Sequence, residues 1–281
     1  MTIDFARLLL PWEFSAWIFA ASLAALTLFW RGCFSLRSTG QVVSTARKTA
    51  FYLGLGLAYA VTHTYADYLA QHMFWVHRLQ HLVLHHVAAF LIIISRPARI
   101  LLAGVPQTWT FGWGERVQRP VLLGLVYKAL QNSVVAPLLF VGLVAYWLQP
   151  EVHFTAMLSA FRYQWMNWSM FLDGLLFWAW VFPDRTATAP QRHYFISRIA
   201  VLWLVMIAQI VIGASIALSR HELYSVYAVC GRAWAMSASA DEDLGGLITW
   251  IPSAMMSVLA MLLIIRNAVR EANIRRIGAK A

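Results

Sequence analysis

The sequence predicts an all-α membrane protein with seven transmembrane helices, and three observations support this prediction. Hydrophobic residues make up 60% of the 281 residues, charged residues only 12%, and the mean hydropathy is +0.62. Soluble domains are typically about 45–50% apolar and about 25% charged. The apolar residues form seven long runs without period-two alternation, which indicates helices rather than strands. Basic residues gather between the runs, as they do in polytopic proteins.

The seven predicted spans form a single domain of residues 1–281. They cover residues 13–30, 50–70, 79–95, 121–148, 156–182, 195–218 and 246–265. Each approaches or exceeds the length that a helix needs to cross about 30 Å of hydrocarbon. The third run is the shortest and the most polar at its start, whereas the fourth and fifth are long enough to tilt or to extend beyond the bilayer.

The distribution of Lys and Arg predicts the orientation. If the stretch 31–48 is cytoplasmic, then 96–120, 183–198 and the tail after 265 are cytoplasmic too, and these four stretches carry sixteen basic residues. The opposite side carries four: Arg7, Arg78, Arg220 and Arg232. Positive charge is enriched on the cytoplasmic side of membrane proteins. We therefore expect the N-terminus outside and the C-terminus in the cytoplasm of a bacterial inner membrane. The net charge of +10 is then explained by the basic residues that set the membrane orientation, and no nucleic-acid partner is expected.

Histidines concentrate on the side away from the cytoplasm. Eight of the nine fall in the outer half of the predicted bundle or in its outer loops, and only His193 lies inside. His77, His81 and His85 are spaced four apart, which places them along one face of a helix, and Met73 continues the same line.

The preceding helix carries further polar residues at its outer end. His63 and Asp67 share a face there, and the short connection makes the two helices antiparallel neighbours. Imidazole binds copper, zinc and iron, and a thioether favours monovalent copper. Asp67 is expected either to bind the metal or to orient a histidine. The predicted metal ligands are His77, His81, His63, His72, His85 and Met73.

A non-functional role is the alternative to metal binding, because a histidine at a membrane interface often only packs its ring on apolar groups and exposes its polar end to water. We interpret His153, His193 and His221 in this way. His85 and His86 point to different faces, so at least one of them is expected to serve packing or a hydrogen bond.

Two other polar groups fall within predicted spans. Asp173 lies deep in the fifth span and suggests a proton or ion role or a structural partner, and Asn167 lies nearer the outer end. The acidic residues Asp241 and Asp243 precede the last span. We interpret them as a solvated cap at a helix N-terminus, with a cation-attracting rim as the alternative.

Two stretches resemble the CtaG family of cytochrome c oxidase assembly factors. Residues 77–84 read His-Arg-Leu-Gln-His-Leu-Val-Leu and are followed by Pro97 and the Leu-Leu-Ala-Gly of 101–104. Residues 241–252 read Asp-Glu-Asp-Leu-Gly-Gly-Leu-Ile-Thr-Trp-Ile-Pro, and a Leu-Phe-Trp at 176–178 is similar to a third region. The resemblance spans roughly residues 50–265.

The chain also departs from that family. Its first signature has Arg78 where the family has Met. It reads Trp-Leu-Gln-Pro at 147–150 in place of Trp-His-x-Pro, and Tyr-Gln-Trp-Met-Asn-Trp at 163–168 in place of a histidine pair. A metal site that used those positions would be altered, with His63, His72 and Met73 left to compensate.

The resemblance implies a bacterial inner-membrane protein that helps a haem-copper oxidase to mature. The favoured role is copper delivery to the binuclear centre of the catalytic subunit, with a periplasmic chaperone as the copper donor. Copper would be held briefly, and no covalent chemistry is required, so we do not expect an enzyme. A pure scaffold for the oxidase subunit would show the same spans.

Rival interpretations remain open. The pairs His72 with His77, and His81 with His85 and His86, look like two histidine boxes of membrane di-iron desaturases, but a third box and a cytoplasmic location are lacking. A haem-binding electron carrier could use His63 and His81 on two helices. A transporter would need more polar lining residues than the spans provide.

Overall fold

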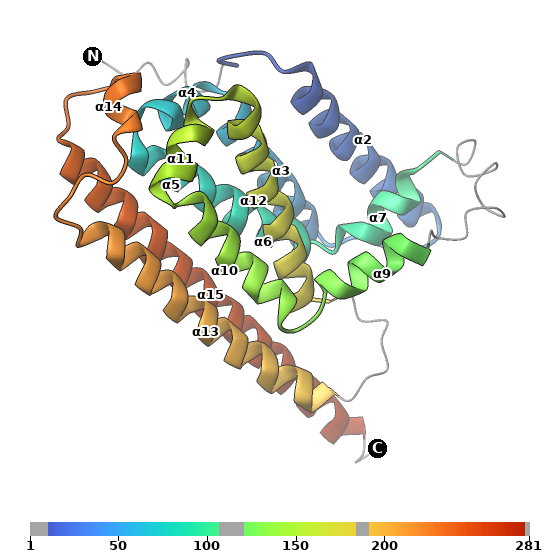
Figure 1. Cartoon of the computed structure of the whole chain (residues 1–281). Coiled ribbons are helices and arrows are strands. Elements are labelled where there is room, and N and C mark those ends of the chain that lie inside the picture. Colours follow the sequence, from blue (N-terminus) through green and yellow to red (C-terminus); the bar gives the residue numbers. More distant parts are fainter. Residues whose placement is uncertain (1–10, 107–120, 184–190, 279–281) are drawn as a thin grey trace.

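The computed structural model describes residues 11–106, 121–183 and 191–278, and within these ranges the chain is helical with no β-strand (Figure 1). This confirms the all-α class. The residues used for the predicted orientation that lie outside these ranges are Arg7, Arg116, Arg119, Arg185 and Lys280. The side chains of Arg192, His193 and Arg275 are likewise outside the described part.

Helices form at each of the seven predicted runs. Their bounds are α2 Ala16–Ser38, α3 Thr45–His63, α4 Tyr65–His72, α5 Phe74–His81, a π-helix Leu82–Ala88, α6 Ala89–Ile94, α7 Pro97–Gly104, α9 Val121–Leu130, α10 Val135–Trp147, α11 Pro150–Met157, α12 Ala160–Val181, α13 Gln191–Ala217, α14 Val226–Cys230 and α15 Ala238–Gly278. Four segments of the described chain are long and apolar enough to cross a membrane, or five if the bent pair α9 and α10 is one span. The number seven and the orientation therefore stay predictions.

The fourth predicted run, 121–148, is not one straight helix, so whether it is a single span stays a prediction. Helices α9 and α10 meet at an angle of 73°. The carboxamide oxygen of Asn132 accepts hydrogen bonds from the backbone amides of Val134 and Val135, at 2.8 and 3.4 Å, so the side chain caps α10. Asn competes with the helical backbone in this way and favours helix ends.

The second run is also interrupted. Helix α3 ends at His63, and the backbone of Thr64 is extended. The side-chain hydroxyl of Thr64 accepts a hydrogen bond from the amide of Ala66. Helix α4 then begins at Tyr65. The prediction that His63 and Asp67 share one helix face is therefore wrong, because the break at Thr64 separates them.

The third run is the most buried of the candidate spans and lies inside the bundle, with α5, the π-helix and α6 following one another from Phe74 to Ile94. Helix α12 crosses it closely at Gly174, where a Cβ would collide with the carbonyl oxygen of His85. The carbonyl of His85 also accepts a hydrogen bond from Nε1 of Trp178, at 3.2 Å. This close crossing sets the polar side chains of α12 against the histidines.

Helices α13 and α15 lie side by side along one flank of the bundle (Figure 1). Their backbones touch where glycine meets glycine: a Cβ on Gly213 would lie 2.7 Å from the carbonyl oxygen of Gly246. Helix α2 lies on the opposite flank and packs mainly on α7. Small residues at such crossings permit the close backbone approach that packing in a lipid environment favours.

Candidate functional site

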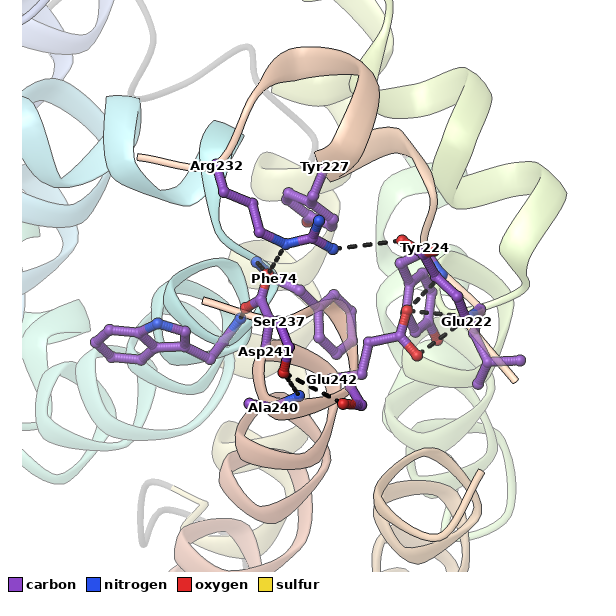
Figure 2. A network of polar contacts seen from close by, with 12 residues as sticks. Phe74, Glu222, Tyr224, Tyr227, Arg232, Ser237, Ala240, Asp241 and Glu242 are labelled. Atoms are coloured by element: carbon purple, nitrogen blue, oxygen red, sulfur yellow. Dashed lines mark hydrogen bonds and ion pairs between the residues drawn. The ribbon is translucent and has the colours of Figure 1, made fainter. Parts of the chain in front are cut away.

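The first turn of α5 is held by an acidic residue of α15, Asp241. Met73 has an extended backbone, so α5 starts afresh at Phe74. The carboxylate of Asp241 accepts hydrogen bonds from the amides of Phe74 and Trp75, at 3.2 and 2.9 Å, and pairs with Nε of Arg232 at 3.3 Å. Figure 2 shows this network, with the guanidinium of Arg232 lying between Asp241 and Glu222.

The predicted solvated cap is wrong for Asp241, because this side chain is fully buried and caps α5 rather than its own helix. Glu242 is also buried and accepts hydrogen bonds from the amides of Leu223 and Tyr224. Asp243 is exposed, so both the cap and the rim interpretation stay open for that residue alone.

His77 and His81 form a pair one helical turn apart on α5. Their ring centroids are 4.3 Å apart. A third imidazole, that of His153 on α11, lies 5.1 Å from His77 in an edge-on arrangement. All three side chains are buried. Within the described part of the molecule, neither ring nitrogen of His77 makes a hydrogen bond of good geometry, although the backbone of Ala70 lies close enough to interact with the ring.

His81 uses both of its ring nitrogens. Its Nε2 lies 3.0 Å from the carboxamide oxygen of Asn167, and its Nδ1 lies 3.4 Å from the guanidinium of Arg78. A guanidinium only donates hydrogen bonds, so Nδ1 of His81 accepts and its proton sits on Nε2, which donates to Asn167. Asn167, noted in the sequence as a polar group within the fifth span, is thus the partner of a histidine.

His153 is also fully bonded. Its Nδ1 donates to the carbonyl of Trp147 at 3.1 Å, and its Nε2 accepts from the hydroxyl of Tyr227 at 2.9 Å. Burial, and then the positive charge of Arg78, lower the pKa of His153 to about 3. This imidazole is therefore neutral at physiological pH, which is the form that binds metals.

His85 and His86 lie in the π-helix and form a second tier. Their ring centroids are 5.0 Å apart. Nε2 of His85 donates to Asp173 at 3.1 Å, and Nε2 of His86 accepts from the amide of Gln209 at 2.8 Å. His85 therefore has a partner of its own in Asp173, while the π-helix that begins directly after His81 changes the winding between the two residues. Asp173 has a structural partner, as one interpretation of it predicted.

The other predicted ligands lie elsewhere. The ring of His63 packs against Phe14 and Tyr59, with centroids 5.5 and 4.8 Å away. Nδ1 of His72 donates to the carbonyl of Tyr68 at 2.8 Å. None of the described contacts joins His63 or His72 to His77.

Met73 and Asp67 have different partners again. Met73 is buried in a hydrophobic cluster with Ala70 and Val76. Asp67 accepts hydrogen bonds from Nε2 of Gln80 at 2.7 Å and from the hydroxyl of Tyr163 at 2.8 Å, so it contacts no histidine directly. Within the described ranges, no group of three or more His, Cys, Asp or Glu side chains is arranged to hold a metal ion.

A small cavity lies between the two histidine tiers. Its polar lining comes from Arg78, His81, His85, His86, Gln209, Thr249 and Ser253. The volume open to the centre of a water molecule is about 10 Å³, which is room for about one water. A haem could not fit there, so the cavity gives no support to the interpretation as a haem carrier.

A sequence model of the cytochrome c oxidase caa3 assembly factors matches residues 27–271, nearly the whole chain. The chain belongs to the CtaG family. Within the described residues, several helices are apolar and long enough to cross a membrane.

The relatives of this CtaG protein include mycobacterial proteins of greater length. It is 24% identical over 275 residues to the uncharacterized protein Mb0105 of Mycobacterium bovis and to the uncharacterized protein MT0111 of Mycobacterium tuberculosis, covering 95% of this chain and 40% of each relative. The uncharacterized protein ML1998 of Mycobacterium leprae is 23% identical over 282 residues, with 95% and 41% coverage. This chain thus spans about two fifths of their length. No solved structure matches it significantly.

The two signatures that suggested the CtaG family touch each other in space. Asp241 caps the start of α5, and Nε of Arg78 donates to the hydroxyl of Thr249 at 3.0 Å. Gly245 faces the ring of Phe74 so closely that a Cβ would overlap it. The stretches 77–84 and 241–252 therefore form one packed unit.

Sequence reasoning missed three residues of this site. His153 was set aside as an interfacial histidine, and Gln209 was not singled out at all. Arg78 was counted as a basic residue of the outer side, yet its side chain is buried inside the bundle. Gln209 could have been found as a lone carboxamide in an otherwise apolar span, but its partner could not.

Proposed function

We propose that this protein assists the assembly of a cytochrome c oxidase in a bacterial inner membrane by holding a copper ion briefly at His77 and passing it to the catalytic subunit of the oxidase. Family membership supports the assembly role. The copper role rests on one observation: the buried ring of His77, which makes no hydrogen bond of good geometry, faces two further imidazoles, whereas the similarly unbonded ring of His63 faces only Phe14 and Tyr59.

An unpartnered imidazole is unusual in a protein interior. Buried polar groups are nearly always hydrogen-bonded, and an unsatisfied one costs about 1–3 kcal/mol. The lone pair of a neutral imidazole is a good ligand for copper. Both nitrogens of His81 and of His153 have other partners, so either ring would give up one hydrogen bond to join His77. Losing that hydrogen bond would offset part of the copper-binding energy, so the ion could be released again.

A passing site needs few ligands from its own chain. Among the described residues no group of three or more side chains is arranged to hold a metal, so the proposed site would use His77 with one neighbour. Open positions would let a donor and an acceptor ligate the same ion in turn. The proposed partners are a periplasmic copper chaperone and the catalytic subunit. The predicted topology would turn the His77 end of α5 toward the periplasm, where such a chaperone would supply the ion.

Metal analysis of purified protein tests the copper role. Wild-type protein and a His77→Ala, His81→Ala double variant are loaded with Cu(I) under reducing conditions, desalted and analysed by mass spectrometry. His72→Ala is the matched control, because that ring is hydrogen-bonded to Tyr68 outside the site. We expect copper in wild type and control and its loss in the double variant. Equal copper in all three would overturn the ligand assignment.

A deletion strain tests the assembly role separately. Oxidase activity and the copper content of the isolated oxidase should both fall in the strain and return when the gene is restored. Fully active oxidase in the deletion strain would remove the function. Neither role requires bonds to be made or broken by this chain, so the proposal describes a carrier rather than an enzyme.

A further inference from the structure

Arg78 carries a charge into the interior of the helix bundle. Its side chain is only 4% exposed. The guanidinium donates to the hydroxyl of Thr249 at 3.0 Å and to Nδ1 of His81 at 3.4 Å, and both of these partners are neutral. A buried charge without a counter-charge costs several kcal/mol even after relaxation, and ionisable groups at membrane depth are usually paired.

The buried carboxylates of the bundle are engaged elsewhere. Asp173 accepts from His85, and Asp241 pairs with Arg232 and two backbone amides. Asp67 accepts from Gln80 and Tyr163. Across the described residues, no carboxylate forms an ion pair with Arg78. The charge of this arginine is thus left uncompensated by the chain.

The cavity between the histidine tiers adjoins Arg78 and is lined by both hydrogen-bond donors and acceptors. Ser253 contributes a hydroxyl, whereas Oε1 of Gln209 and Nδ1 of His85 are acceptors without a partner among the described residues. Because Nε2 of His86 accepts from Gln209, the proton of this ring sits on Nδ1, and that buried atom has no partner within the described ranges. A second, independent group therefore has a hydrogen to donate beside the cavity.

We propose that this cavity binds a small monovalent anion, chloride in the cell, as the counter-ion of Arg78. The guanidinium supplies the charge, and His86 and Ser253 supply donors. The volume open to the centre of a water-sized particle is about 10 Å³, so the proposed ligand is a single small ion rather than a polyatomic anion such as sulfate or phosphate. The cavity adjoins the proposed copper site, because His81 lines it, but the proposed anion donors Arg78, His86 and Ser253 are not proposed copper ligands, so either proposal can fail without the other.

Thermal unfolding in detergent tests the proposal without any variant. Sodium chloride or bromide is titrated against sodium gluconate at constant ionic strength, since gluconate is too large for the cavity. Ligand that binds only the folded state raises the Tm, on the order of 3–5 °C for each tenfold increase above the dissociation constant. We expect this rise with both halides. A Tm that follows ionic strength alone means that the cavity holds only water, and it would overturn the proposal.

An Arg78→Met variant locates the anion. Replacing a buried charge by an apolar residue of similar volume is often neutral or stabilising, so the variant is expected to fold. Its Tm should be independent of chloride, and equilibrium dialysis with radioactive chloride should show bound anion in wild type but not in the variant. Arg220→Gln, which removes an exposed charge, is the control and should keep the full response. Equal chloride binding by wild type and Arg78→Met would refute the site.

Discussion

Replacing Asp241 by alanine is expected to release the start of α5 and with it the histidine pair. The carboxylate holds the amides of Phe74 and Trp75 at 3.2 and 2.9 Å, deep in the protein. His77 lies one turn further on, since its amide donates to the carbonyl of Met73. No other acceptor for the two amides lies within the described contacts, so alanine would leave both without a partner.

The magnitude follows from these contacts. Loss of a helix cap costs about 0.5–2 kcal/mol, and a buried donor without a partner costs about 1–3 kcal/mol. The amide of Phe74 is buried and that of Trp75 is partly buried, while Arg232 is close enough to the surface to regain water. We expect the free energy of unfolding to fall by about 3–4 kcal/mol. This corresponds to a Tm lower by about 6–15 °C.

The assay is thermal unfolding of the purified protein in detergent, followed by circular dichroism. Asp243→Ala is a matched control, because this neighbouring carboxylate is exposed and its loss should change stability by less than about 0.5 kcal/mol. A Tm for Asp241→Ala within the error of the control would show that the carboxylate does not hold α5.

Three further predictions concern packing, hydrogen bonding and pH. Gly174→Ala should destabilise the fold by about 1–3 kcal/mol, because the new methyl group would collide with a carbonyl of the π-helix. Gly142→Ala places its methyl group in open space and should leave the stability unchanged. Urea titrations compare the free energies of unfolding of the two variants. Asn167→Leu should cost about 1–3 kcal/mol by leaving Nε2 of His81 unpartnered, again measured by Tm. Because the pKa of His153 is about 3 when folded but about 6.5 when unfolded, the unfolded state binds an extra proton between these values. Acidification from pH 7 to 4 should therefore lower stability, by up to about 1.4 kcal/mol per pH unit from this group, and His153→Gln should show a shallower fall.

The fold class could be predicted from composition and hydropathy, because only helices and closed barrels satisfy their backbone hydrogen bonds within lipid. The positions of helices follow from long apolar runs, and each predicted run does contain helix. The breaks within runs could not be read in this way. Thr64 and Asn132 interrupt their helices through local side-chain hydrogen bonds, two for each residue. Such residues also occur in the middle of helices.

The site was predicted only in part, and the reason is that its partners come from distant segments. The spacing of His77 and His81 was enough to place them together. His153 joins them from a short helix whose sequence carries no signal for that position. Asn167 and Asp173 were recognised as costly polar groups, but the crossing of α12 over the π-helix decides which histidine each one meets.

The π-helix Leu82–Ala88 makes the two histidine tiers separately adjustable. Such a segment accommodates one residue more than an α-helix of the same height, so losing a single residue there would restore regular winding. Six residues of regular α-helix would turn the chain about as far as the seven residues of the π-helix do, so His77 and His81 would keep their places beside α12 and α11. Within the segment itself, His85 or His86 would move away from its partner, Asp173 or Gln209. A one-residue deletion there is therefore a route by which the tier of His85 and His86 could change without disturbing His77 and His81.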